Sequence, residues 1–117
     1  MPNNNSKPRN VLPLVLKGKW YDMIASGEKK EEYRDLKPFW INRIGKWHHQ
    51  QLLLGEDKRA CVLYVAFSRG YKKADLFFEV DEVQKRHWAT HRDWGEPDYP
   101  HFVLKLGKRI PKEEFGR

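Results

Sequence analysis

The stretch Gly27-Glu28-Lys29-Lys30-Glu31-Glu32-Tyr33-Arg34 has the pattern G-x-K-x-x-E-x-R, and the rest of the chain can be read outward from it. In a strand, Glu32 and Arg34 project from the same face, about 7 Å apart at the backbone, so they can pair or bind one polar ligand together. Lys29 is out of phase with them. It reaches the same place only if the chain bends before Glu31, as is common beside binding sites. The alternative is a solvated run of charges on an edge strand.

A short strand and a short helix precede the motif. Val11 to Leu16 is apolar enough for a strand, and Pro13 places that strand at a sheet edge or in its lead-in. Between Lys19 and Ser26, three apolar residues follow the spacing i, i+3, i+4 and predict one buried helical face: Trp20, Met23 and Ile24. Gly27 ends this helix in a left-handed conformation.

The segments after the motif alternate between helix and strand. Asp35 can cap a helix from about Leu36, with Pro38 in its first turn, and Gly45 is expected to end it. Lys46 to Gln50 then forms a loop. Further strands are expected at Ala60 to Phe67, which is apolar on both faces, at Asp75 to Val83, which pairs with it as a hairpin, and at His101 to Leu106.

The order of these segments around the motif resembles the ASCH family of small PUA-like proteins. The resemblance includes Phe67-Ser68-Arg69-Gly70 at a strand end and the closing strand from His101 to Gly107, and it spans about Val11 to Ile110. It implies an α+β fold, a mostly antiparallel barrel of five or six strands with two or three short helices, the Trp20 helix at one end. The expected organisation is a flexible basic tail at 1–10, one domain at 11–110 and a polar tail at 111–117.

Composition limits the class of protein. The 117 residues suit one domain, and 23 Lys and Arg against 16 Asp and Glu give a charge of +7, which favours a polyanionic partner. The single Cys61 cannot form an internal disulfide and suits a reducing cytoplasm, where we expect the protein as a monomer. The amino end has no apolar core typical of a signal peptide, and no apolar run reaches the ~20 residues of a membrane span.

The segment Lys85 to Trp94 interleaves cations with indoles, which is the composition of a surface that binds phosphates while stacking bases. Its candidate contact residues for nucleic acid are Lys85, Arg86, Trp88, Arg92 and Trp94. The alternative is that these Trp residues plug the end of the barrel.

The resemblance implies binding of nucleic acid, with RNA favoured, or of a modified nucleoside or nucleotide, and enzymatic activity in some members. We expect a cleft lined by Lys29, Glu32 and Arg34 and bordered by Ser68, Arg69 and Glu96, with no cofactor and no metal. Lys29 and Arg34 supply donors for phosphate or carbonyl oxygens, and Glu32 supplies an acceptor.

A small hydrolase is the alternative, and a protein-interaction module is a third. Some relatives hydrolyse an amide on acetylated nucleosides with the motif Lys beside a Thr, where this chain has Glu32 and so lacks the hydroxyl. Lys29 can still act as a base if burial lowers its pKa. A distal acid could come from Asp93, Glu96 or Asp98, and histidines for RNA cleavage from His48, His49, His87 or His91.

Overall fold

The computed structural model describes residues 10–53 and 62–115, without the side chains of 50–53. Its elements in chain order are β1 (Asn10–Leu16), α1 (Gly18–Ala25), β2 (Glu31–Asp35), α2 (Pro38–Leu53), β3 (Leu63–Arg69), β4 (Leu76–Arg86), a 3-10 turn (Arg92–Trp94), β5 (His101–Ile110) and a second 3-10 turn (Lys112–Phe115). The strands form one five-stranded sheet in the order β1-β3-β4-β5-β2. β1 and β3 are parallel and the other neighbours antiparallel, which confirms the predicted α+β, mostly antiparallel class.

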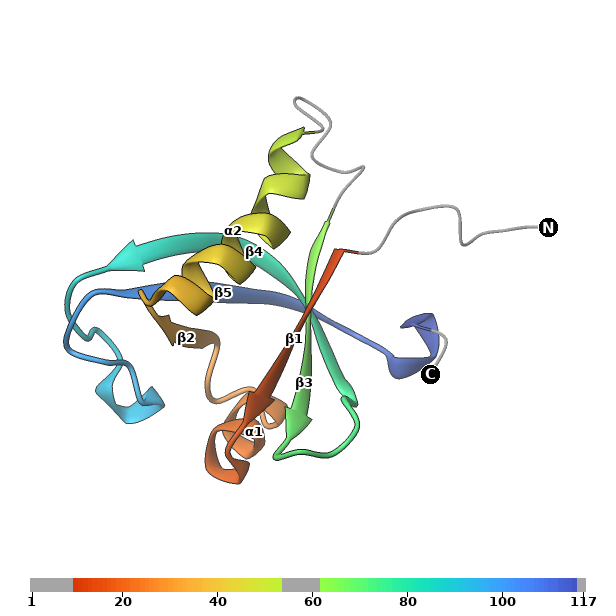
Figure 1. Ribbon diagram of the computed structural model, residues 1–117. Coiled ribbons are helices and arrows are strands. Elements are labelled where there is room, and N and C mark those ends of the chain that lie inside the picture. Colours follow the sequence, from red (N-terminus) through yellow and green to blue (C-terminus); the bar gives the residue numbers. More distant parts are fainter. Residues whose placement is uncertain (1–9, 54–61, 116–117) are drawn as a thin grey trace.

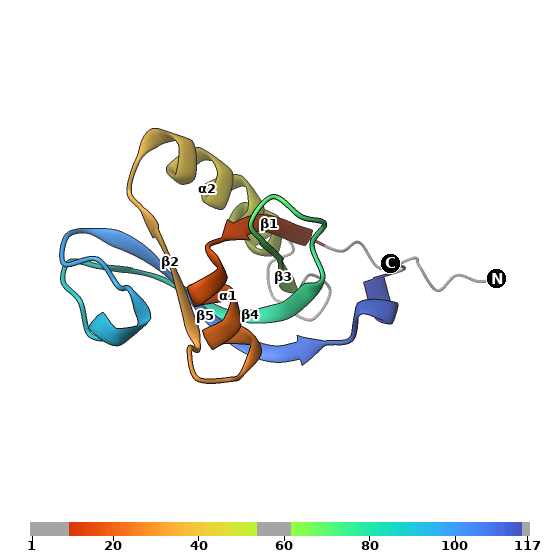
Figure 2. The same ribbon diagram turned by 90° about the horizontal axis from the view of Figure 1, so that it is seen from below.

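The sheet is strongly curved, and Figures 1 and 2 show α1 at one end of it, while α2 packs mainly against β1 and β3. The ladder between β4 and β5 shifts register twice, between Phe78 and Val80 and between Val80 and Glu82. Such irregularities bend a strand and increase its twist. The predicted barrel is therefore a half-barrel, with β1 and β2 as its edge strands.

A main hydrophobic core fills the concave side of the sheet. On β4, Leu76, Phe78 and Val80 contribute to it from one face, as their alternation predicts. Phe77, on the opposite face, packs with Ala66 and Ile110 in a second, smaller cluster. β3 is therefore covered on both sides, which confirms the expectation for a central strand that is apolar on both faces.

The end of α1 is as predicted. Gly27 has a φ of 88°, and its amide donates to the Ile24 carbonyl at 3.1 Å. A left-handed residue here turns the chain out of the helix and directs it toward β2. Of the predicted apolar face, Ile24 is buried in the main core, where Tyr21 and Ala25 pack beside it. Trp20 and Met23 are half-buried, and Trp20 lies against Lys29 instead.

The predicted end of the second helix at Gly45 is wrong, because α2 continues to Leu53. Trp47, expected in a loop, is 4% exposed, and its Nε1 donates to the carbonyls of Asn10 and Tyr64 at 3.1 Å each. A glycine inside a helix costs roughly 1 kcal/mol. Burying a large aromatic side chain contributes about 2 to 3 kcal/mol, so packing outweighs the local stop signal.

Some predictions lie outside the described residues. These concern the tail before Asn10, the start of the predicted strand at Ala60 and Cys61, and the last two residues of the polar tail. Within the part of the chain that the structure describes, no helix has the length and apolar character needed to cross a membrane.

Candidate ligand-binding site

The motif has the bend that its spacing required. Between Gly27 and Glu31 the chain is irregular, and the Lys29 amide donates to the Met23 carbonyl at 2.9 Å. The Lys29 ammonium consequently lies 3.4 Å from one Glu32 oxygen, while the other Glu32 oxygen accepts a hydrogen bond from Arg34 at 2.7 Å. All three side chains of the pattern thus come together.

The Lys29 side chain is enclosed by the protein. Lys29 is 3% exposed, and its Nζ donates to the Trp94 carbonyl at 2.5 Å. It also lies over two aromatic rings, 5.1 Å from the centroid of Trp20 and 4.5 Å from that of Tyr33. Burial lowers the pKa of Lys29, against the opposing effect of Glu32. Lys29 therefore fastens the start of β2 to the loop that carries Trp94.

Arg34 joins the two edges of the sheet. Its guanidinium donates to the Val15 carbonyl on β1 at 3.1 Å and lies 4.8 Å from the ring centroid of Trp40. Its Nε is a buried donor for which the described residues supply no hydrogen-bond partner. Arg34 is thus the motif residue with unused hydrogen-bonding capacity, and its side chain is 16% exposed.

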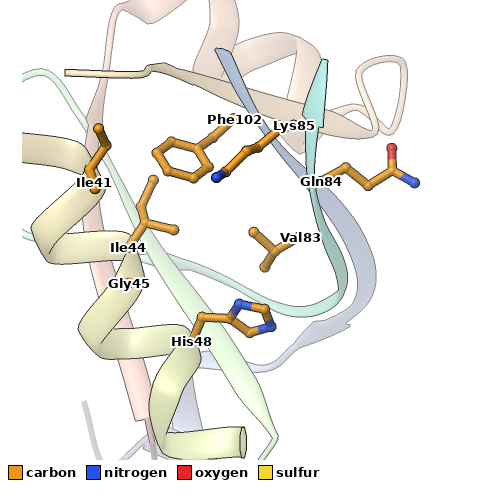
Figure 3. Close-up of a pocket in the computed structure, with 8 residues that line it drawn as sticks. All are labelled: Ile41, Ile44, Gly45, His48, Val83, Gln84, Lys85 and Phe102. Atoms are coloured by element: carbon orange, nitrogen blue, oxygen red, sulfur yellow. The ribbon is translucent and has the colours of Figure 1, made fainter. Parts of the chain in front are cut away.

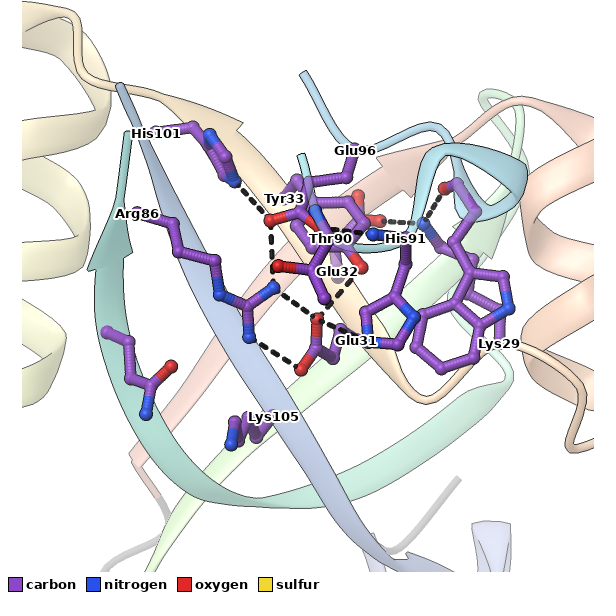
Figure 4. A network of polar contacts seen from close by, with 12 residues as sticks. Lys29, Glu31, Glu32, Tyr33, Arg86, Thr90, His91, Glu96, His101 and Lys105 are labelled. Carbon is purple, nitrogen blue, oxygen red and sulfur yellow. Dashed lines mark hydrogen bonds and ion pairs between the residues drawn. The ribbon is translucent and has the colours of Figure 1, made fainter. Parts of the chain in front are cut away.

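A second polar group lies on the other face of β2 (Figure 4). Glu31 receives two hydrogen bonds from the Arg86 guanidinium and one from the Tyr33 hydroxyl, each at 2.9 Å. Burial alone would raise the pKa of Glu31, but the hydrogen bonds from Arg86 and Tyr33 bring this pKa below its ordinary value. A two-pronged arginine–carboxylate pair of this kind fixes geometry as well as charge.

Glu96 extends this group to the loop between β4 and β5. One carboxylate oxygen contacts Arg86 at 2.8 Å and His101 Nε2 at 2.6 Å, and the other accepts from the amides of Thr90 and His91 at 2.8 Å. Burial opposes ionisation here, but these hydrogen bonds lower the pKa of Glu96 to about 2. A single buried carboxylate therefore holds the loop against the sheet.

The cations and carboxylates of the two groups are balanced. Three cations face three carboxylates: Lys29, Arg34 and Arg86 against Glu31, Glu32 and Glu96. Buried charges are tolerated when they are paired and hydrogen-bonded, and removing one partner is costly. The sequence predicted that Lys29 and Glu32 offer a donor and an acceptor to a ligand, whereas in the structure they contact each other, the Trp94 carbonyl and Arg34.

The three residues predicted to border the cleft, Ser68, Arg69 and Glu96, contact different parts of the protein. Glu96 belongs to the network, and Ser68 is buried on β3 in register with Val15. Arg69 pairs with Asp22 of α1 at 3.1 Å and is half exposed. The described contacts therefore connect Glu96, but not Arg69, to the motif and its network.

The residues predicted to contact nucleic acid differ in their exposure. Arg86 is held inside the network, whereas Lys85 is exposed. Trp88 is exposed over 66% of its surface, and Arg92 is exposed and pairs with Asp98 at 3.1 Å. Trp94 stacks on His91, with 4.0 Å between ring centroids and 15° between planes.

Sequence reasoning missed Glu31, Tyr33 and His101 as members of the network. The signal for the first two was available, because residues that flank Glu32 in a strand share the face opposite to it. His101 is fully buried at the start of β5, and only the fold brings it to Glu96. Within residues 10–53 and 62–115, no group of three His, Cys, Asp or Glu side chains is arranged so as to hold a metal ion.

The polar contacts of Lys29 bear on catalysis. They are with a carbonyl and a carboxylate, while the nearby Tyr33 hydroxyl donates to Glu31. His91 Nε2 lies 4.0 Å from Glu31 rather than on Lys29. The lowered pKa of Lys29 suits a base, but the described contacts place neither a hydroxyl nor an imidazole on its ammonium.

Comparisons with known proteins give one structural match to report. No family model matches the chain, and no curated protein matches it. A solved structure of a serine-to-alanine mutant of ZmASCH, from Zymomonas mobilis, is 13% identical and aligns over 91% of this chain and 77% of that one with a TM-score of 0.47. It bears the name of the family that the sequence resembles. At this level of similarity the match carries no argument about the site.

Proposed function

We propose that this chain binds RNA, or a nucleotide-like molecule, on the loop between β4 and β5 where that loop meets the motif. The observation that carries the proposal is the Trp88 indole, 66% exposed on a loop whose position is fixed by buried charges. Indole faces stack on bases of any sequence.

Cations and further rings surround Trp88 along the chain. Lys85 and Arg92 are exposed and can contact phosphates, and the His91–Trp94 stack gives a second flat surface. Phosphate contacts supply affinity while stacking holds the bases. The net charge of +7 acts in the same direction.

The motif supports this surface from beneath. Lys29 binds the Trp94 carbonyl, and Glu96 binds the amides of Thr90 and His91, so both ends of the His91–Trp94 turn are fixed. Holding a binding loop in place before the ligand arrives reduces the entropy lost on binding. In this proposal Lys29 and Glu32 position the loop, and Arg34 holds Glu32 in place through its hydrogen bond at 2.7 Å.

A hydrolase acting on an acylated nucleoside is the second candidate, and the lowered pKa of Lys29 favours it. A base must reach the proton that it removes. The Lys29 ammonium binds the Trp94 carbonyl, so this activity requires the loop to move away from Lys29. Release of acetate from N4-acetylcytidine, lost in Lys29→Met, would favour the hydrolase over a simple binding protein.

The binding proposal is tested by fluorescence anisotropy with a short labelled single-stranded RNA. Loss of one stacking side chain costs about 1 to 3 kcal/mol, so Trp88→Ala should weaken binding roughly 5- to 150-fold. Tyr71→Ala is the matched control, because Tyr71 is an exposed aromatic residue (98%) on the separate basic loop after β3. Equal affinity of Trp88→Ala and wild type would reject the proposal.

Salt dependence gives a second measurement on the same complex. Replacing Lys85 and Arg92 together by glutamine should reduce the slope of log affinity against log salt by about 2, since each phosphate contact contributes about one unit. Lys72→Gln with Lys73→Gln removes the same charge from the loop after β3. If that pair flattens the slope and the first pair does not, the RNA surface lies on the β3–β4 loop instead.

A further inference from the structure

A pocket of about 470 Å³ lies between α2 and the paired strands β4 and β5 (Figure 3). Its lining residues are Ile41, Ile44, Gly45 and His48 from α2, Val83, Gln84 and Lys85 from β4, and Phe102 from β5. Sites for small molecules typically measure ~300 to 1,000 Å³. The volume therefore suits one small organic molecule.

The walls of the pocket are apolar and its ionisable groups are nitrogen bases. Figure 3 shows the Lys85 ammonium beside the Phe102 ring and facing α2, with the His48 imidazole at another corner. Gln84 turns away and donates to Glu82 at 2.8 Å. The lining set contains no carboxylate, and Lys85 forms no ion pair within the described residues.

Gly45 leaves the helix wall open. A Cβ atom built at Gly45 would meet nothing within 4 Å, so packing against the rest of the protein does not require glycine there. Glycine is also among the least favourable residues inside a helix. The chain thus keeps a residue that weakens α2 and leaves room in the pocket.

We propose that this pocket binds a small amphipathic anion, with a flat apolar body between Ile44, Val83 and Phe102 and an acidic group on Lys85. Charge complementarity selects the anion, because Lys85 brings an ammonium into a lining that holds no carboxylate. Burial lowers the pKa of His48, so its imidazole offers a neutral hydrogen-bonding group rather than a second charge. A flat ring system fills a slot between a helix and a sheet with less entropy loss than a flexible chain. This site goes beyond the RNA-binding proposal, since Trp88 and Arg92 do not line it and Lys85 is the one residue of the RNA surface that does.

The test uses 1-anilinonaphthalene-8-sulfonate and its uncharged counterpart N-phenyl-1-naphthylamine, titrated into the full chain and followed by their emission. We expect saturable binding of the sulfonate to the native protein at one molecule per chain, and weaker binding of the neutral amine. Lys85→Gln should weaken the sulfonate about tenfold, since a charged contact is lost, and leave the amine unchanged. Lys46→Gln, on α2 but outside the pocket lining, is the control for charge and should change neither.

A steric variant tests the location. Gly45→Leu should abolish binding of both probes because its side chain enters the pocket, whereas Gly45→Ala should bind both. Both substitutions favour the helix, so the fold should persist. If Gly45→Leu fails to fold, amide shifts in wild type on adding the sulfonate decide the matter. Shifts confined to residues 41–48, 83–85 and 102 support the site, while shifts elsewhere, or equal binding of the two probes, overturn it.

Discussion

Glu96 joins the β4–β5 loop to Arg86 and His101 of the sheet, and glutamine is the replacement closest to it in shape. Glu96→Gln retains an oxygen for the amides of Thr90 and His91. It places a neutral NH₂ group where the carboxylate oxygen met Arg86 at 2.8 Å and His101 at 2.6 Å. The substitution therefore removes one buried negative charge and sets donor against donor, with little change in shape.

Two independent estimates give the loss of folding stability in Glu96→Gln. Removing one partner of a buried ion pair costs about 3 to 5 kcal/mol, and the lower end applies because Arg86 keeps Glu31. The lowered pKa of Glu96, from 4.5 to about 2, corresponds to about 3 kcal/mol of stability above both values. We therefore expect Glu96→Gln to lower the free energy of unfolding by about 3 kcal/mol near neutral pH.

Urea unfolding of wild type and variant, repeated over a series of pH values, measures this loss and its cause. A carboxyl whose folded pKa is depressed stabilises above its unfolded pKa and loses that effect as the pH falls through the folded pKa. The gap between the two proteins should thus narrow as the pH falls from 4.5 toward 2. Glu82→Gln, an exposed carboxylate 3.9 Å from Lys105, is the matched control and should cost less than 1 kcal/mol. If Glu96→Gln costs no more than Glu82→Gln, or the gap is independent of pH, the buried network does not hold the loop.

Two further stability predictions follow from the described packing. Gly95→Ala should destabilise the protein by more than the roughly 1 kcal/mol expected for Gly27→Ala. Both glycines have a positive φ, but only at Gly95 would an added Cβ come within 2.6 Å of the Trp20 ring. Equal losses of stability in thermal unfolding would contradict this. Trp47→Ala should lower the free energy of unfolding by about 3 to 5 kcal/mol and reduce the helical circular dichroism signal. A loss below 1 kcal/mol would mean that the Trp47 side chain does not anchor the second half of α2.

Patterns of local spacing predicted the elements well where one short-range effect dominates. The stop of α1 at Gly27 needs only a residue that tolerates positive φ. The meeting of Lys29, Glu32 and Arg34 follows from the two-residue period of a strand and one bend. The two-sided burial of β3 follows from its uninterrupted apolar run.

The predictions were wrong where contacts between residues far apart in the sequence determine the structure. Gly45 is a stop signal locally, but Trp47 finds the carbonyls of Asn10 and Tyr64, which are far away in sequence, and the helix continues. Arg86 looked like a surface cation because its partner Glu31 lies 55 residues earlier. Neither contact has a short-range signature, so composition and spacing could not assign these residues to the interior.

Stacking of RNA on the loop between β4 and β5 can be located residue by residue in an NMR titration. The protein, labelled with ¹⁵N, is titrated with a short single-stranded RNA while the backbone amides and the indole N–H signals of its five tryptophans are followed. We expect the largest shifts at the Trp88 indole and at the amides of residues 87–94, and no shift of the Trp47 indole, which α2 buries against Asn10 and Tyr64. Shifts confined to residues 69–73, or a spectrum that does not change at saturating RNA, would contradict it.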